Sequence, residues 1–243
     1  MTIRISLSGL AILLAATAQA QQAPIGQVGA AAQANLDALT TGAATVVPRS
    51  GAYGTIGSPY LDKRWLPGRL QMTNGVPMAP VPLKYDVLNH RLMMLPLNRR
   101  DSLLLDDRKL ASFQLEEPAI NATGIRLRTF RRFLEAPEAA LRSEYVEVLH
   151  SGKYTLLKRH IKQLRKANYQ GPYSSGEQYD QIDDKSNYFL LRPDARLVPV
   201  KLTLKAMQAA APELAQALKA APGASSAKAE EEWVAVLATV DAK

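Results

Sequence analysis

A seven-residue stretch, VPLKYDV at residues 81–87, indicates the fold class of this chain. Its apolar side chains alternate with Pro, Lys and Asp, and a period of two residues is typical of a strand with one buried and one solvated face. Pro82 has no backbone N–H for a ladder, so it belongs on an edge strand or among the first residues of a strand. The stretch therefore predicts a sheet of which one face is covered.

Short apolar runs of the same kind extend on both sides of this stretch, from Tyr53 to about Val200. Pro, Gly, Asn and Asp separate them, which is typical of strands joined by turns. The other expected strands are 69–73, 92–97, 102–105, 110–115, 125–130, 144–149, 154–157, 187–191 and 196–200. In sequence order they predict an antiparallel β-meander or partial barrel.

Two turns and one long loop are expected between these strands. Asn74-Gly75 offers the left-handed backbone conformations of a tight hairpin turn. Residues 150–153, HSGK, predict a second short turn with Gly152 at positive φ. Residues 167–187 are polar and rich in Gly, Pro, Ser and Asp, which predicts a long loop.

The hydrophobic period changes after residue 201. Apolar residues now recur at the spacing of one helical face, namely Leu204, Met207, Ala211, Leu214, Ala215 and Leu218. Pro212 would break a continuous helix but suits the first turn of a new one, so two short helices are expected, joined near Ala211. Trp233, Val236, Leu237 and Val240 mark a last helix, with acids at 230–232 in its first turn. Strands followed by helices predict a segregated α+β fold.

The first twenty residues have the three parts of a secretory signal peptide. Arg4 precedes an apolar run from Ile5 to Ala16, and Ala18-Gln19-Ala20 matches the cleavage pattern. We expect cleavage after Ala20 and export to the periplasm, the outer-membrane periphery or the extracellular space. No later stretch approaches the length of about 20 apolar residues that spans a bilayer, so no transmembrane span is expected after signal removal.

The expected organisation follows from these boundaries. Residues 1–20 are the signal peptide, and 21–50, rich in Ala, Gln and Thr, form a flexible N-terminal arm. Residues 51–201 form the β-rich domain, 202–221 a helical cap, and 222–243 a linker and terminal helix. The chain has no cysteine, which excludes disulfides, zinc–thiolate sites and a lipid-bearing cysteine.

Residues 57–75, GSPYLDKRWLPGRLQMTNG, leave two interpretations open. Tyr60 and Trp65, if exposed, have apolar faces on which sugar rings can stack. Both also precede an expected strand, and a large aromatic that buries about 150–250 Å² would anchor that strand against the sheet. The sequence favours the anchor over the ligand platform.

The motifs of common catalytic and metal sites do not occur in the sequence. His90, His150 and His160 lack the spacing of metal ligands on one helix, and there is no HExxH. The acidic run 180–184 departs from the EF-hand pattern. No GxSxG elbow, P-loop or GxGxxG occurs. We therefore expect no metal and no cofactor.

A basic run, KYTLLKRHIKQLRK at residues 153–166, is the candidate binding segment. Its apolar residues fit an amphipathic helix on a membrane surface, but Tyr154 and Leu156 also alternate as in a strand. A strand would place the lysines on an exposed face or edge, where they deter aggregation. As a binding site, the run would offer these four cations to an acidic polymer or an anionic membrane: Lys158, Arg159, Lys162 and Arg165. Nucleic acid is not favoured, because aromatics do not interleave with the charges.

Several short motifs occur in a recognisable order, namely GSPYL, W..G, NG and VPLKYDV, then YVEVLHSGKYTLLK, NYFLL and a helical tail with a Pro-Glu step. In this order, over about residues 54–221, the chain resembles a group of exported bacterial proteins to which no activity is assigned. The resemblance implies a signal peptide, a short arm, a β-meander and a closing helical tail. It implies no catalytic residue.

Three functions are compatible with the sequence. The first is a non-catalytic binding or scaffold module of the bacterial cell envelope, with a protein, lipid or glycan as partner. The second is an exported hydrolase whose carboxylates converge only in the fold. The third is a binder of acidic polymers or anionic membranes through residues 153–166, to which a formal net charge of +8 would contribute.

Overall fold

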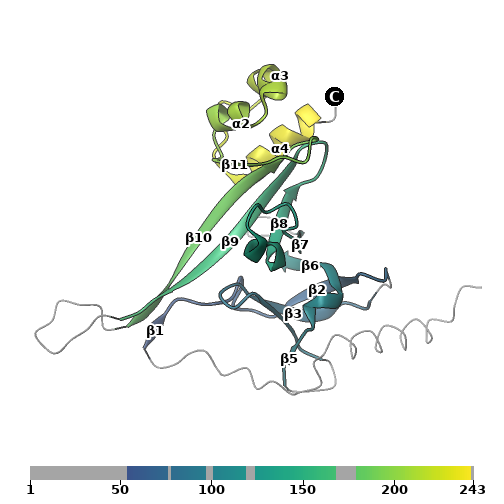
Figure 1. Cartoon of the computed structure of the whole chain (residues 1–243), viewed down its shortest axis with the longest axis vertical. Coiled ribbons are helices and arrows are strands. Elements are labelled where there is room, and N and C mark those ends of the chain that lie inside the picture. The colour runs from purple at the N-terminus through teal and green to yellow at the C-terminus, as the bar shows by residue number, and fades with distance from the viewer. Residues whose placement is uncertain (1–53, 76–77, 97–100, 119–123, 168–178, 242–243) are drawn as a thin grey trace, which may run out of the picture.

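The computed structural model describes residues 54–75, 78–96, 101–118, 124–167 and 179–241. The predicted signal peptide and N-terminal arm lie outside these residues. Within them the chain forms one open, mostly antiparallel sheet and a few short helices, mainly at the C-terminal end (Figure 1). The prediction of an α+β fold with a β-meander is confirmed.

The sheet in the described residues has eleven strands. They are β1 (Thr55–Ile56), β2 (Leu66–Met72), β3 (Val81–Asp86), β4 (Arg91–Met94), β5 (Leu103–Leu104), β6 (Leu110–Pro118), β7 (Ile125–Arg132), β8 (Tyr145–His150), β9 (Thr155–Arg165), β10 (Asp180–Leu191) and β11 (Leu197–Val200). The spatial order is β1-β10-β9-β8-β7-β6-β2-β3-β4-β5, and β11 also pairs with β10. Only β1 runs parallel to its neighbour.

The meander is not continuous. Strands β2 to β5 form one meander and β6 to β10 form another, and the two are joined because β6 pairs with β2 rather than with β5. Gly68 of β2 lies at this junction, where a Cβ atom would come within 2.5 Å of Leu83 Cδ1 and 2.7 Å of the Gln114 carbonyl oxygen. A larger residue at this position would push the two meanders apart.

Strand β3 has the alternation that its sequence predicts. Val81, Leu83 and Tyr85 are buried, whereas Pro82 and Lys84 are only half-buried. Pro82 is the second residue of β3, in agreement with the prediction that it belongs to the first residues of a strand. Because β3 lies between β2 and β4, the edge alternative is wrong.

Each of the two predicted turns is confirmed only in part. Gly75 has a positive φ of 74°, but the end of β2 pairs with β6, and the β2–β3 ladder begins only at Gly68 and Val81. Asn74-Gly75 therefore ends a strand without closing a tight hairpin. The β8–β9 hairpin is confirmed. Gly152, in the turn of this hairpin, does not have positive φ. A glycine is required at this position because the Asp241 side chain approaches it closely.

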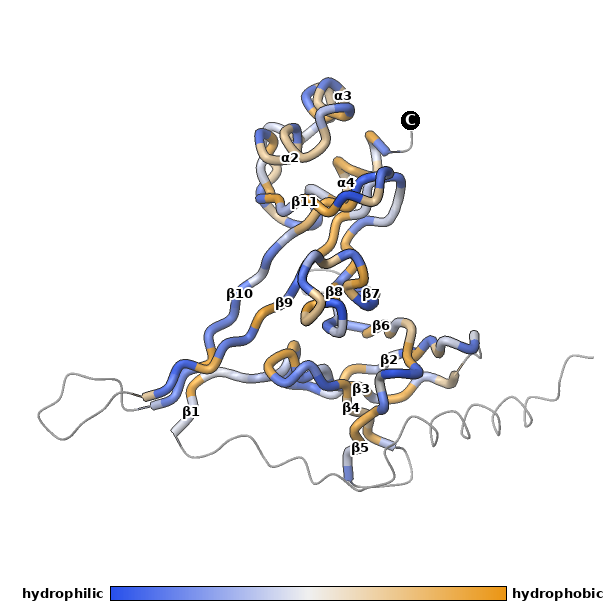
Figure 2. Tube along the Cα trace, in the orientation of Figure 1, coloured by the Kyte–Doolittle hydropathy of each residue, from blue (hydrophilic) through white to orange (hydrophobic). Residues whose placement is uncertain are grey.

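The predicted loop 167–187 is wrong over its last eight residues, because Asp180 to Asn187 belong to β10. Most of this strand is hydrophilic, as Figure 2 shows, so it lacks the apolar alternation by which strands are recognised. Cross-strand charge pairs with β9 stabilise it instead. Arg165 Nε, at the end of β9, lies 3.6 Å from Asp183 Oδ2, and Nζ of Lys166, the next residue, lies 2.8 Å from Asp180 Oδ2.

The C-terminal helices are α2 (Leu204–Ala210), the 3-10 turn η3 (Pro212–Leu214), α3 (Ala215–Ala220) and α4 (Glu230–Asp241). The predicted break near Ala211 and the predicted last helix are confirmed. Glu232 accepts the backbone N–H groups of Lys228 and Ala229 at 2.7 and 2.9 Å, which caps the start of α4. The helices lie together at one end of the molecule, over the ends of β9, β10 and β11 (Figure 1).

Two main cores result from this arrangement. One fills the bend of the sheet with side chains of β2, β3, β4, β6, β7 and β8, and there the rings of Phe113 and Phe130 stack with centroids 4.8 Å apart. The other lies between the sheet and the C-terminal helices around the fully buried Trp233. A smaller cluster on the opposite face contains Phe133, Val146 and Leu157.

The predicted anchor role of Trp65 is not what the structure shows. Trp65 is half-buried and lies outside the cores. Lys84 Nζ lies 4.9 Å from the centroid of the Trp65 ring and 4.8 Å from that of Tyr60. The two aromatics therefore hold a lysine of β3 between them, in cation–π geometry.

Candidate ligand-binding site

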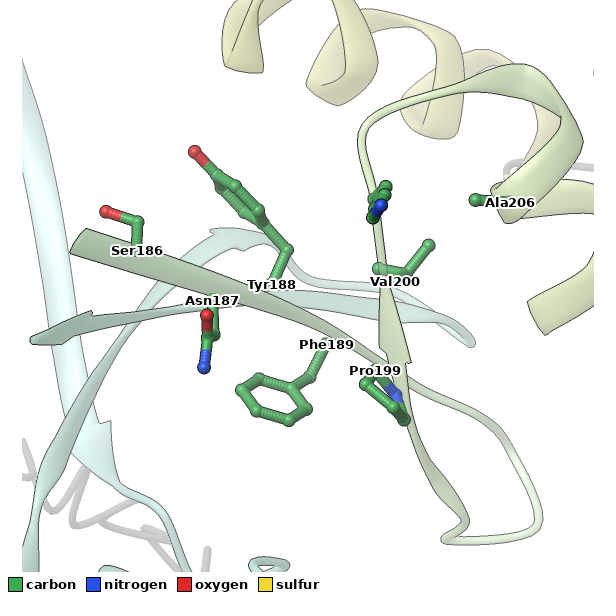
Figure 3. Close-up of a pocket in the computed structure, with 8 residues that line it drawn as sticks. Ser186, Asn187, Tyr188, Phe189, Pro199, Val200 and Ala206 are labelled. Atoms are coloured by element: carbon green, nitrogen blue, oxygen red, sulfur yellow. The ribbon is translucent and has the colours of Figure 1, made fainter.

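The candidate site lies on one face of β7 to β10, which we call the inner face. The ladder places Glu147 of β8 opposite Lys158 of β9, and Lys158 opposite Tyr188 of β10. Farther along, Lys162 is opposite Asp184. Figure 3 shows the alternation along β10, where Ser186 and Tyr188 project to one side and Asn187 and Phe189 to the other. Even-numbered residues of β9 and β10 thus share the inner face.

A buried charge cluster forms the floor of the site. Arg128 of β7 donates from Nε and Nη2 to the two carboxylate oxygens of Glu147, at 2.8 and 2.7 Å. His160 Nε2 lies 2.7 Å from Glu147 Oε2, and the Glu147 side chain is only 2% exposed. Arg128 Nη1 also reaches Glu117 Oε2 at 3.5 Å. Each charge in this cluster has an opposite charge beside it, as burial requires.

The pKa values of the cluster follow from this geometry. Burial by itself would raise the pKa of Glu147, but the hydrogen bonds from Arg128 and His160 outweigh it and hold that pKa well below its usual range. Burial lowers the pKa of His160, although Glu147 opposes the shift. At neutral pH, Glu147 is therefore ionised and His160 is neutral.

The C-terminal helix extends the same network. Glu230, in the first turn of α4, accepts hydrogen bonds from Lys158 Nζ at 2.5 Å and from the Tyr188 hydroxyl at 2.7 Å. Arg126 Nη1 donates to Glu231 Oε1 at 3.0 Å. These contacts tie α4 to β7, β9 and β10, and they support the cluster from the helical end of the molecule.

An open cavity of about 330 Å³ adjoins the cluster on the inner face. Its lining consists of Leu61, Arg128, Lys158, His160, Lys162, Asp184, Lys185 and Ser186. Three of these residues, Arg128, Lys158 and Lys162, carry a permanent positive charge on the inner face, and Asp184 is the single carboxylate in the lining. Lys185 also borders the cavity, but by the alternation along β10 it belongs to the opposite face. Such a lining suits a polar, negatively charged ligand, because positive side chains at the wall attract it and one apolar side chain offers little surface to a lipid tail.

The structure divides the four cations that the sequence singled out. Lys158 and Lys162 lie on the inner face and line the cavity. Arg159 instead donates from Nε and Nη2 to Glu144, at 2.7 and 2.9 Å, and Arg165 contacts Asp183. The run 153–166 is therefore no amphipathic helix, and the strand interpretation is confirmed.

The expected exposure of these lysines is wrong. The side chains of Lys158 and Lys162 are only 15% and 9% exposed, because acids from α4 and β10 cover them. Sequence reasoning also missed Arg128 and Lys185 as lining residues. A signal for Arg128 did exist in the alternation of Arg126, Arg128 and Phe130 along β7. It indicates that these three side chains share a face.

The alternation along β7 also departs from the usual pattern, in which apolar side chains are buried and charged side chains are exposed. Ile125 and Leu127 are 69% and 53% exposed, whereas Arg128 and Phe130 are buried. The guanidinium carbon of Arg128 lies 5.4 Å from the centroid of the Phe130 ring, so the charge cluster packs directly on the first core. Hydropathy alone assigns the wrong face to this strand.

The carboxylates that meet here do not form an acid–base pair of the kind a glycosidase needs. A general acid requires a raised pKa, whereas cations next to Glu147 and Glu230 lower the pKa of each despite burial. Among the described residues, no group of three or more His, Asp or Glu side chains is arranged to hold a metal ion. His90 and His150 lie apart from the cluster and contact Glu144 and Asp241, respectively.

A larger cavity of about 610 Å³ lies at the fork where β11 leaves β10 (Figure 3). Its lining is mostly uncharged, with Lys201 as the single charged residue. Tyr188 and Val200 approach it from the inner face, and Phe189 and Pro199 from the other. It carries no group of polar side chains that converge on one point, so the cavity at the charge cluster is the better candidate.

No protein-family model, curated protein or solved structure matches this chain. In the part of the chain that the structure describes, none of the helices combines the length and the apolar character that crossing a bilayer requires.

Proposed function

We propose that this chain is an exported, non-catalytic binding module of the bacterial cell envelope, and that it binds an acidic glycan in the cavity between β7, β9 and β10. The observation that supports this most directly is the lining of the cavity, in which Arg128, Lys158 and Lys162 carry positive charge on the inner face and Asp184 is the single lining carboxylate. The signal-like N-terminus supports the location. Of the four cations that the sequence singled out for the third function, the proposal retains Lys158 and Lys162, and it adds Arg128.

An acidic glycan is favoured over a lipid headgroup by the chemistry of the lining. Leu61 is the one residue of the lining with a large apolar side chain, whereas an acyl chain would need a continuous apolar wall. A sugar acid presents hydroxyls and a carboxylate, and these match the lysine ammonium groups and the Ser186 hydroxyl. Because Arg128 and Lys158 already have acidic partners, the affinity for one sugar unit is expected to be low, and a polymer gains by multivalency.

The test measures binding of the purified chain to polygalacturonate, with a neutral galactan as reference and anionic lipid vesicles as a second arm. We expect retention on polygalacturonate that salt weakens, and little on galactan or vesicles. Lys162→Gln should weaken it, because Lys162 lies on the inner face and lines the cavity. Lys166→Gln is the matched control, because Lys166 directly follows β9 and contacts Asp180 of β10 but lies outside the cavity lining. Equal loss in both variants, or binding to vesicles alone, would contradict the proposal.

A further inference from the structure

The pair Lys162–Asp184 stands out in the cavity because its two members differ strongly in exposure. The Lys162 side chain is 9% exposed and that of Asp184 is 63% exposed, with Nζ and Oδ2 2.5 Å apart. A covered ammonium group needs a negative partner. A carboxylate in water does not, so the contact matters far more to Lys162 than to Asp184.

The position of the pair adds a second constraint. The two residues are directly opposite in the β9–β10 ladder, and both line the cavity. The carboxylate of Asp184 therefore occupies the position from which a ligand carboxylate would reach Lys162. It can leave this position by side-chain rotation alone, since no other hydrogen bond from a described residue holds it.

We propose that Asp184 is an internal substitute for the ligand: its carboxylate occupies the anion position on Lys162 in the free protein, and an anionic group of the ligand displaces it. This inference rests on the proposed function and names the specificity-determining pair of that site. This exchange makes the cavity selective for anions, because a neutral sugar cannot supply the negative charge that is removed from beside Lys162 when Asp184 moves away.

Two variants and one control test the inference. Asp184→Asn leaves the anion position free of competing charge. We therefore expect it to bind oligogalacturonate about threefold or more tightly than the wild type at low salt, the upper range of an exposed ion pair. Asp183→Asn is the control, because Asp183 is the adjacent residue on the opposite face and contacts Arg165. It should leave the affinity within twofold. Unchanged or weaker binding by Asp184→Asn would overturn the inference.

A thermal measurement separates this inference from the proposed function, because it needs no glycan. Asp184→Ala should melt at a lower temperature than the wild type, and sodium acetate should restore the melting temperature more than sodium chloride at equal ionic strength. Lys162→Met combined with Asp184→Ala should remove the acetate effect. If acetate restores the melting temperature of Asp184→Ala but neither the wild type nor the variants bind the glycan, the proposed function is wrong and the anion position on Lys162 is supported. If acetate has no specific effect, the anion position is refuted.

Discussion

Asp241, the last residue of α4, lies with its Oδ2 atom 3.0 Å from Nε2 of His150 at the end of β8. The same oxygen accepts the backbone N–H of Tyr154 at 3.3 Å. The Asp241 side chain is only 4% exposed, so these bonds form away from water. They attach the end of the C-terminal helix to the β8–β9 turn and thereby close the second core.

The first prediction concerns the residue that makes room for this contact. A Cβ atom at position 152 would lie 1.8 Å from Asp241 Oδ2, so Gly152→Ala must displace the carboxylate and break both of its hydrogen bonds. We expect a loss of about 1–3 kcal/mol in the free energy of unfolding, the usual cost of crowding a buried side chain, because the Asp241 carboxylate is covered even though Gly152 is exposed. Urea titration followed by tryptophan fluorescence measures it. Gly124→Ala is the control, because a Cβ there meets nothing within 4 Å, and a larger loss in the control would contradict this view.

The second prediction compares the two tryptophans. Trp233 is fully buried between the helices and the sheet, so Trp233→Ala should cost about 3–5 kcal/mol, the usual range for a large core aromatic. Trp65 contributes a half-buried contact with Lys84, so Trp65→Ala should cost only about 1 kcal/mol. Unfolding free energies of the two variants give the comparison, and Trp233→Phe provides a milder variant if Trp233→Ala does not fold. Equal losses would restore Trp65 as a structural anchor.

The third prediction is a decline in stability at acidic pH in two stages. Burial, and repulsion from Lys158 and Arg128, lower the pKa of His160 below its usual 6.5 despite Glu147. Below about pH 6.5 the His160 ring therefore binds a proton more readily in the unfolded chain than in the folded chain. The free energy of unfolding consequently falls as the pH decreases. A further fall begins below about pH 4.5, where unfolded Glu147 is protonated and the folded carboxylate is still ionised.

Urea titrations between pH 3 and pH 8 measure this profile. His160→Gln can keep a hydrogen bond to Glu147 but has no titrating ring, so it should abolish the decline that begins below about pH 6.5 and leave in place the one that begins below about pH 4.5. A wild-type profile that is flat from pH 7 to 5, or one that is identical in the variant, would show that the buried imidazole does not titrate in this way.

The candidate site shows where sequence patterns stop being informative. Lys158 and Lys162 belong to a run that is visibly basic, and two-residue alternation places them on one face of a strand. Asp184 lies in a segment whose polar composition indicates a loop, because a strand with two polar faces has no hydrophobic period. Arg128 comes from a strand in which Ile125 and Leu127 are exposed while Arg128 itself is buried. None of these three elements alone indicates that their side chains surround one cavity.

The sequence by itself determined the local structure: the alternation in VPLKYDV, the β8–β9 hairpin, the break at Pro212 and the buried face of the last helix. Each of these depends on side chains within one or two turns or one strand, so hydrophobic periodicity and backbone preference suffice to predict them. Only the tertiary structure decided that β6 pairs with β2, that α4 is attached through Asp241, and that the cations of β7, β9 and β10 meet around Glu147. Those contacts join residues far apart in the chain, and their free energy depends on burial and opposite charges that the folded arrangement alone provides.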